Sequence, residues 1–368
     1  MKRNLIERKL GKVDRALAKA IEGAETAGAV LLAKQRREGE WLKHEAVAGL
    51  AVAKPDRVPM QRDSVFDLAS LTKPIATTTA IMLLIADGKV ALEDPVAKHI
   101  PAFAEREKDA VTVRHLLTHS SGLRPWRGYH ELLLEKERKR GERWMCTEEG
   151  RAFILERVIK SALVHEPGTA AVYGDLDFIA LGAVVEAVSG ERLDAFCRER
   201  IFEPLGLTET SFRPLGDDAP EALPRARIAA TEECPFRERV VWGEVHDPNA
   251  YAMGGVAGHA GLFAPAADVM RFAEVVLEVW HGRSELLPRE LVRNFATRQK
   301  LPPESDWALG WDTPTAGVSS SGQYFSAASI GHLGFTGTSL WIDLEREAIV
   351  VFLTNRIHLV AKRSRYAL

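Results

Sequence analysis

Strand-like segments near both ends of the chain place the strongest constraint on its fold. Residues 28–34 and 41–52 are rich in apolar and β-branched residues and are joined by a polar turn at residues 37–40. Residues 339–343 and 348–353 repeat this pattern around a charged turn near the other end. Two hairpins so far apart in sequence predict one antiparallel sheet that is built from both chain ends.

Helical periodicity dominates the chain between these hairpins. Apolar residues recur at helical spacing in segments 177–188, 193–202 and 267–280. A further amphipathic helix is expected before the first strand, from the spacing of Val13, Ala16, Leu17, Ala20 and Ile21. At 368 residues the chain exceeds the usual size of a single core. We therefore expect an α+β fold with a helix-flanked sheet domain at residues 1–72 and 295–368 and an inserted, mostly helical domain at 73–294.

The composition narrows the choice of partners. A formal net charge of −2 gives no electrostatic reason to expect nucleic acid. The cysteines Cys146, Cys197 and Cys234 are too few and too scattered for a disulfide framework or a metal cluster, and we expect neither metal nor cofactor. No apolar run approaches the length of a membrane span, and the N-terminus lacks the apolar core of a signal peptide. We expect a cytoplasmic protein, and the oligomeric state stays open.

The stretch Ser70-Leu71-Thr72-Lys73 carries the candidate nucleophile. In a helix, positions three apart share one face, so the lysine amine would lie beside the serine hydroxyl. A serine hydroxyl is a weak nucleophile until an adjacent base takes its proton, and a lysine of lowered pKa can be that base. The apolar segment 74–86 follows, which would place the serine near a helix N-terminus. A Ser-x-x-Lys can also occur by chance, so partners must decide.

A tyrosine could complete the proton path of such a site. Tyr173-Gly174-Asp175 is the only Tyr-x-[Asn/Asp] in the chain, and a helix is expected directly after it. A tyrosine held near two cations can ionise well below its ordinary pKa of about 10 and act as a general base. The alternative is a tyrosine that only packs in a turn.

The third element is the glycine-rich segment 331–337, directly before an expected strand. Glycines there, among them Gly334, would let a strand edge approach a substrate closely. The backbone N–H groups of Phe335 and Ser70 could then form an oxyanion hole. His332 could hydrogen-bond a substrate carboxylate or the tyrosine, or it is a structural loop histidine.

These three elements in this order resemble the signature of the serine β-lactamase and penicillin-binding protein superfamily. The chain is most similar to the branch that holds class C β-lactamases, D-alanyl-D-alanine carboxypeptidases, D-aminopeptidases and related carboxylesterases. Further stretches are similar to that branch: 113–123, 181–182 with 188–190, 201–210 and 258–263. The similarity runs from about residue 16 to residue 354, nearly the whole chain.

The resemblance implies a mixed α/β domain packed on a helical domain, with the site in the crevice between them. By analogy, Ser70 is the acyl-accepting nucleophile and Lys73 its base or proton carrier. Tyr173 would relay protons and activate the deacylating water, and His332 would occupy the position of a lysine. Relatives also close with a longer helix than residues 356–368 provide.

Two departures from the family pattern bear on function. Asp175 stands where asparagine is commoner, and a carboxylate can only accept hydrogen bonds, so it should favour a charged Lys73 and weaken it as a base. His332 is largely neutral near pH 7, whereas a lysine would suit a substrate carboxylate. Both departures favour an esterase or amidase over a β-lactamase.

Other residues are weaker candidates. Trp126 and Tyr251 could line the mouth of the crevice. Glu166 precedes Tyr173 and is expected to be structural, and His119 to be a packed histidine. His246-Asp247 and His259 lack a third partner at metal-ligand spacing, which argues against a zinc site.

We therefore expect a serine hydrolase that cleaves a small-molecule ester, amide or β-lactam through an acyl-serine. A carboxylesterase with weak β-lactamase activity is the leading interpretation. A D-alanyl-D-alanine carboxypeptidase or D-aminopeptidase is the enzymatic alternative. A penicillin-binding sensor that acylates without turnover is the alternative from another class.

Overall fold

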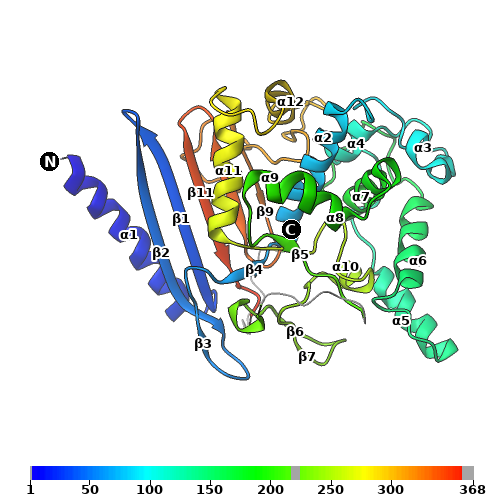
Figure 1. Cartoon of the computed structure of the whole chain (residues 1–368), viewed down its shortest axis with the longest axis horizontal. Coiled ribbons are helices and arrows are strands. Elements are labelled where there is room, and N and C mark those ends of the chain that lie inside the picture. Colours follow the sequence, from blue (N-terminus) through cyan, green and yellow to red (C-terminus); the bar gives the residue numbers. More distant parts are fainter. Residues whose placement is uncertain (1, 217–223, 359–368) are drawn as a thin grey trace.

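The computed structural model describes residues 2–216 and 224–358 (Figure 1). Its centre is a six-stranded antiparallel sheet of order β3-β2-β1-β11-β10-β9. The strand bounds are β1 (Gly28–Arg37), β2 (Glu40–Val52), β3 (Val58–Pro59), β9 (Ser329–Leu333), β10 (Ser339–Asp343) and β11 (Ala348–Thr354). The expected α+β fold with one antiparallel sheet made by both chain ends is confirmed.

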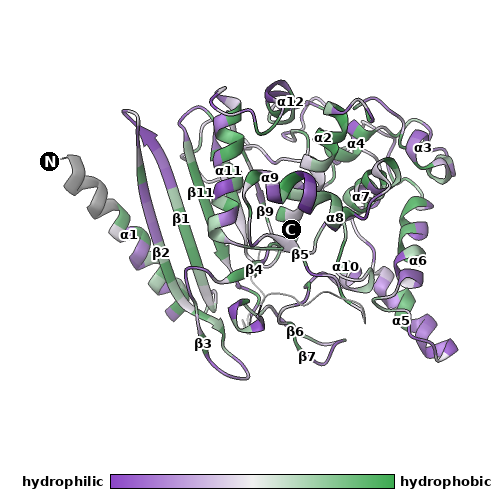
Figure 2. Ribbon diagram, in the orientation of Figure 1, coloured by the Kyte–Doolittle hydropathy of each residue, from purple (hydrophilic) through white to green (hydrophobic). Residues whose placement is uncertain are grey.

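Strand β1 lies in the middle of this sheet and joins the two terminal hairpins. It pairs with β2 on one side and with β11 on the other, in a register that places Val30 opposite Val47 and Leu353. Its first residues are fully buried and apolar, as expected of a strand covered on both faces. Figure 2 shows this apolar character along β1 and β11.

One long helix covers each face of the sheet. Helix α1 (Lys2–Glu22) contacts β2, and α11 (Ala266–Trp280) contacts β1 and β11 on the other face (Figure 1). Helix α11 buries Val269, Phe272, Val276 and Val279, which share one face at spacings of three and four residues. The helix therefore belongs to the sheet layer, although it lies within the range that the sequence assigns to the helical region.

The remaining helices gather on the far side of α11 (Figure 1). Their bounds are α2 (Thr79–Ala86), α3 (Val96–His99), α4 (Val113–Leu117), α5 (Tyr129–Arg140), α6 (Glu148–Ile159), α7 (Asp175–Ser189), α8 (Leu193–Cys197), α9 (Glu203–Leu205), α10 (Pro248–Ala252) and α12 (Arg289–Phe295). Helix α7 is mostly buried up to Val185 and is followed by Gly190, whose φ of +76° is costly for other residues. The helices expected at 177–188 and 193–202 correspond to α7 and to α8 with its continuation.

A helical segment from residue 69 to residue 86 runs through this region. It begins as the 3₁₀ turn η1 (Ala69–Leu71), continues as the π-helical turn η2 (Lys73–Thr78) and ends as α2. By length and hydropathy alone it could cross a membrane, and 78% of it is buried inside the protein. The expectation that no apolar run approaches this length was therefore wrong.

Short strands fix the start of this segment. Strand β4 (Val65–Asp67) pairs with β8 (Leu262–Pro265), which also pairs with β5 (Ser211–Phe212). A separate hairpin joins β6 (Glu233–Cys234) and β7 (Arg239–Val240). None of these strands was expected from the sequence. The expectation about a closing helix falls largely on residues 359–368, which lie outside the described residues.

Candidate active site

Ser70 lies on a strained turn that exposes part of its side chain. The preceding residue, Ala69, has a φ of +46°, in the left-handed region that a residue with a Cβ rarely adopts. Its N–H donates to Asp67 Oδ1 at 2.8 Å, and the other oxygen of this buried carboxylate accepts the His246 N–H at 2.6 Å. Such strain is typical of functional sites, where the surroundings hold it in place.

Two side chains bind the Ser70 hydroxyl, and a third binds one of these two. Tyr173 OH donates to Ser70 Oγ at 2.7 Å, and Lys73 Nζ donates to the same oxygen at 3.0 Å. Lys73 Nζ also lies 2.9 Å from Tyr173 OH and 2.7 Å from Asp175 Oδ1. The structure therefore brings the candidate nucleophile, the lysine and the tyrosine motif into one hydrogen-bonded cluster.

Lys73 is held in its charged form. Its side chain is fully buried, and burial alone would lower its pKa. The charge of Asp175, then that of Tyr173, and hydrogen bonds to both outweigh burial and raise the pKa of Lys73 above its ordinary value. The expectation that Asp175 favours a charged lysine agrees with this geometry.

Tyr173 does not behave as the sequence suggested. Burial raises the pKa of its phenol above 10, the charge of Asp175 adds to this increase, and Lys73 opposes it. The expected lowering of the Tyr173 pKa was wrong, because burial outweighs the opposing effect of Lys73, which donates a hydrogen bond to this phenol. Tyr173 is therefore a neutral hydrogen-bond donor to Ser70 in the resting site.

Aromatic packing fixes the tyrosine ring. The indole of Trp307 stacks on Tyr173 with ring centroids 5.6 Å apart and planes 13° from parallel. The His119 imidazole contacts both rings edge-on, at 4.8 Å from Tyr173 and 4.6 Å from Trp307. Trp307 comes from a loop with no regular pattern, so this contact could not be predicted from the sequence.

His119 belongs to a buried pair behind the tyrosine. Its Nδ1 lies 3.2 Å from Asp177 Oδ2, and Ser121 donates to the other oxygen of this carboxyl. Burial raises the pKa of Asp177 to about 8 and lowers the pKa of His119 to about 3. Between these values the pair is neutral, with the carboxyl as the proton donor to Nδ1.

This pair predicts a pH dependence of stability. Unfolded reference pKa values are 3.8 for Asp177 and 6.5 for His119, so between pH 6.5 and about 8 the folded pair holds one proton more than the unfolded chain. The free energy of unfolding should then fall by about 2 kcal/mol over this window. Asp177→Asn should lack this decrease when the free energy of unfolding in urea is measured at pH 6.5 and at about pH 8. An unchanged slope would contradict the assignment, and Asp87→Asn, at an exposed pair with Arg200, is the control.

His332 occupies the third-motif position as a neutral ring. Strand β9 carries it, so residues 331–333 form the edge strand itself and do not precede it. Its Nδ1 pairs with Leu333 O at 2.7 Å, and its ring lies 5.6 Å from that of Tyr173. Burial, then the charge of Lys73, lowers its pKa to about 3. Its buried Nε2 has no hydrogen-bond partner among the described residues, so it is a free acceptor beside Tyr173.

The turn after β9 is tied to the serine turn by side chains. Thr336 Oγ1 donates to Asp67 O at 2.8 Å, and Thr338 Oγ1 donates to Leu68 O at 2.9 Å. A Cβ on Gly334 would stand 2.6 Å from Leu68 O, so only glycine allows this approach. No hydrogen bond to the Phe335 N–H occurs within the described chain, which leaves this donor free beside the serine turn.

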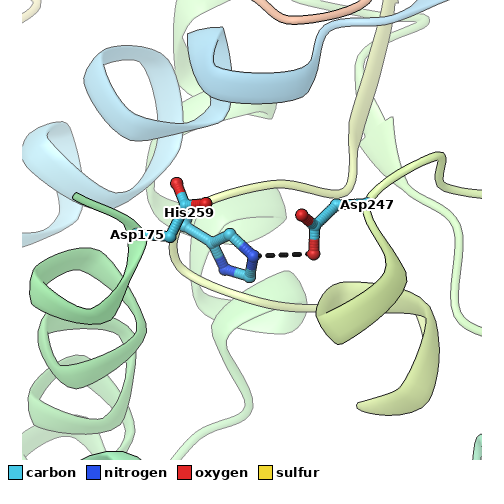
Figure 3. Close-up of side chains that lie close together, drawn as sticks. All are labelled: Asp175, Asp247 and His259. Atoms are coloured by element: carbon cyan, nitrogen blue, oxygen red, sulfur yellow. Dashed lines mark hydrogen bonds and ion pairs between the residues drawn. The ribbon is translucent and has the colours of Figure 1, made fainter. Parts of the chain in front are cut away.

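A second acidic group lies beside Asp175 (Figure 3). His259 Nε2 pairs with Asp247 Oδ1 at 2.9 Å, and potential ligand atoms of Asp175, Asp247 and His259 lie within 4.8 Å of one another. The sequence did not reveal Asp175 as the third member. Carboxylate and imidazole ligands could hold a divalent cation. Asp175 already binds Lys73, so a cation here would compete with that ion pair.

Two candidate mouth residues lie apart from the cluster. Trp126 is 48% exposed, and its ring centroid lies 6.5 Å from that of His130. Tyr251 lies under the Arg237 guanidinium, 3.9 Å from its ring centroid. Within residues 2–216 and 224–358, no hydrogen bond or ring contact joins either to Ser70, Lys73 or Tyr173. Their role in substrate binding stays a prediction.

Comparison with known families agrees with this geometry. The family model described as Beta-lactamase matches residues 13–367, nearly the whole chain. The chain belongs to this beta-lactamase family. It is therefore a serine hydrolase related to β-lactamases and penicillin-binding proteins, as the order of its three motifs predicted.

Curated relatives carry a peptidase name. A protein of Escherichia coli (strain K12) named putative D-alanyl-D-alanine carboxypeptidase is 34% identical over 315 residues, which cover 80% of this chain and 70% of that protein. A protein of the same name from Salmonella typhi is 32% identical over 322 residues, with the same coverage.

Solved structures confirm the fold. EstCE1, described as a hydrolase with promiscuous acyltransferase activity, matches with a TM-score of 0.71 and 23% identity over 95% of this chain and 94% of its own. The octameric penicillin-binding protein homologue from Pyrococcus abyssi matches with a TM-score of 0.69 and 22% identity, over 94% of this chain and 73% of its own. Simvastatin synthase from Aspergillus terreus matches with a TM-score of 0.69 and 22% identity, over 94% of this chain and 92% of its own.

Proposed function

We propose that the protein is a carboxylesterase or amide hydrolase that works through an acyl-Ser70 intermediate and does not require an anionic substrate. The observation that carries this proposal is the double hydrogen bond to Ser70 Oγ from Lys73 and Tyr173, next to the free N–H of Phe335. A nucleophile, proton carriers and an oxyanion donor are the groups that acyl transfer requires.

In acylation, Ser70 Oγ attacks the substrate carbonyl carbon as its O–H bond breaks. The resting site holds a charged Lys73 and a neutral Tyr173, so the reactive form has lost one proton from this pair. The pair then takes the Ser70 proton and gives it to the departing alkoxide or amine. The Phe335 N–H, with that of Ser70, would stabilise the oxyanion.

Deacylation reverses these roles. A water molecule replaces the leaving group, gives a proton to the Lys73–Tyr173 pair and attacks the acyl carbon. The proton returns to Ser70 Oγ as the acid leaves. Asp175 keeps Lys73 in place 2.7 Å away during both half-reactions.

The charges around Ser70 favour neutral acyl groups. The charge of Lys73 is matched by Asp175, and Asp247 adds a further carboxylate close by. His332 contributes no charge near pH 7, because its pKa is lowered to about 3. A substrate carboxylate would therefore meet no unmatched cation at the third-motif position.

A D-alanyl-D-alanine carboxypeptidase is the second candidate. The curated relatives that are 32–34% identical bear this name. Arg356 supports it, because its guanidinium binds Phe335 O at 3.0 Å and stands beside the oxyanion turn, where it could reach a substrate carboxylate.

A substrate panel separates these functions. p-Nitrophenyl butyrate, a peptide ending in D-alanyl-D-alanine, its C-terminal amide and a fluorescent penicillin are incubated with the protein, and product and protein mass are followed. The esterase proposal expects turnover of the ester and indifference to the peptide carboxylate. Turnover confined to the free acid, and lost in Arg356→Gln, would favour the carboxypeptidase. A stable penicillin adduct without any product would indicate a sensor.

Asp175→Asn tests the proton assignment. Removing this carboxylate lowers the pKa of Lys73, so the rising limb of kcat/KM against pH should move to lower pH. A decrease of about one unit in the Lys73 pKa raises the fraction of free base about tenfold, so activity on the ester at pH 7 should rise about tenfold. The control is Asp87→Asn. A limb that stays in place would show that Asp175 does not set the Lys73 pKa.

A further inference from the structure

A cavity of about 280 Å³ lies between α5, α6 and the loops after η3 (Pro101–Ala104) and α4. Its charged lining is cationic except for Glu156 and comprises Arg106, Arg124, Arg127, Arg157 and Lys160. This volume is close to the lower end of the range for ligand pockets, about 300 Å³, so the cavity suits a simple ion or a small organic anion. None of these residues belongs to the Ser70 cluster.

The arginines of this cavity lack carboxylate partners. The Glu156 carboxylate forms an ion pair with Lys160, whose Nζ lies 3.2 Å from Oε1. None of the four arginines forms an ion pair with any described residue. Several arginines elsewhere on the surface do form ion pairs, among them Arg192–Glu148, Arg227–Glu209 and Arg283–Glu278. Unmatched like charges around one cavity repel each other, and a bound anion would relieve this cost.

A buried lysine, Lys108, lies next to the cavity. Lys108 Nζ donates to the carbonyl of Ser161, a cavity residue, at 2.9 Å. Burial, and after it the charge of Arg106, lowers the pKa of Lys108 to about 8. The cavity is therefore positive although the chain as a whole carries a net charge of −2.

We propose that this cavity binds a multiply charged oxyanion, a phosphate or pyrophosphate group that is either free or carried by a small organic molecule. Guanidinium groups match phosphate geometry with paired hydrogen bonds, which a flexible lysine cluster would not. The number of unmatched cations favours a dianion over a single carboxylate. This site is separate from the proposed hydrolase function and does not depend on it.

The cavity and the catalytic site share one anchored segment. Between Arg124 and Arg127, Pro125 O accepts the Asp175 N–H at 2.7 Å. A Cβ on Gly174 would stand 2.7 Å from Pro125 Cα, and Asn249 Nδ2 donates to Arg127 O at 2.8 Å. The backbone that carries the two exposed arginines is therefore held in place before any ligand arrives, which lowers the entropic cost of ordering this segment on binding.

Titration calorimetry on the whole protein tests the proposal, with pyrophosphate, inorganic phosphate and glycerol phosphate as probes at low and high salt. The double variant Arg124→Gln/Arg157→Gln should bind pyrophosphate about 100-fold more weakly, about tenfold for each lost charged hydrogen-bond pair. Arg62→Gln/Arg200→Gln removes the same charge at exposed ion pairs elsewhere and should bind like the unmodified protein. Melting temperature and ester hydrolysis report that both variants are folded.

Each outcome bears on the proposal. Binding of glycerol phosphate at least as tight as that of inorganic phosphate indicates a phosphate carried by an organic molecule, and exclusion of glycerol phosphate indicates a free anion. No heat of binding with pyrophosphate or either phosphate at low salt would overturn the proposal. Equal affinity of the double variant and the unmodified protein for pyrophosphate would also overturn it, since the ion would then bind elsewhere.

Discussion

Ser70→Ala is expected to lower kcat/KM for p-nitrophenyl butyrate by about 10⁴-fold or more, because removing a nucleophile abolishes the covalent route altogether. The fold should survive, since the hydroxyl is partly exposed and its partners Lys73 and Tyr173 remain bound to each other. The measurement is the initial rate of p-nitrophenol release at equal protein concentration, with the circular dichroism melt as the check on folding.

A matched control excludes a general effect of serine removal. Ser189→Ala loses a side-chain hydrogen bond to Val185 O in the last turn of α7, away from the cluster. Its activity should equal that of the unmodified protein within about twofold, as expected of a change outside the site. If Ser70→Ala keeps most of the esterase activity, the nucleophile lies elsewhere and the proposed mechanism is wrong.

Lys73→Met should damage both catalysis and stability. Methionine has a similar length and no charge, so Ser70 loses its proton carrier and Asp175 is left as a largely buried carboxylate without its cation. Breaking a buried ion pair from one side typically costs about 3–5 kcal/mol of stability, and loss of a general base costs about 10²–10⁴-fold in rate. Urea unfolding and ester hydrolysis measure the two effects.

The double variant Lys73→Met/Asp175→Asn separates these effects. Replacing the stranded carboxylate with an amide removes the unpaired charge, so most of the lost stability should return while activity stays low. Recovery of activity together with stability would show that Lys73 acts through folding alone. Loss of activity without any loss of stability would contradict the ion pair that the structure places at 2.7 Å.

The fold could be predicted where the pattern was long and regular. The hairpins around residues 38 and 345 and helix α11 follow from alternation and helical spacing, and the structure confirms them. The edge strand β9 and the strands β4, β5 and β8 could not be found in this way. They have two to five residues, which is too short for a periodic signal, and their pairing depends on contacts between distant segments.

The candidate site could likewise be predicted only in part from the sequence. The three-residue spacing of Ser70 and Lys73 and the Tyr173 motif were visible in the sequence, and the structure brings them together. Trp307 and the Asp247–His259 pair were not visible, because they reach the site from loops whose positions tertiary packing decides. The charge state of the site also depends on burial, which is why Tyr173 stays neutral where a lowered pKa was expected.

The trapped intermediate tests the central claim most directly. The protein is mixed with p-nitrophenyl butyrate, quenched in acid during turnover and digested, and the peptide that contains residues 70–73 is analysed by mass spectrometry. A butyryl group on Ser70 that appears during turnover and disappears when the ester is exhausted is the predicted result. Steady turnover with no acyl group on Ser70, or with the acyl group on another residue, would contradict the acyl-serine mechanism.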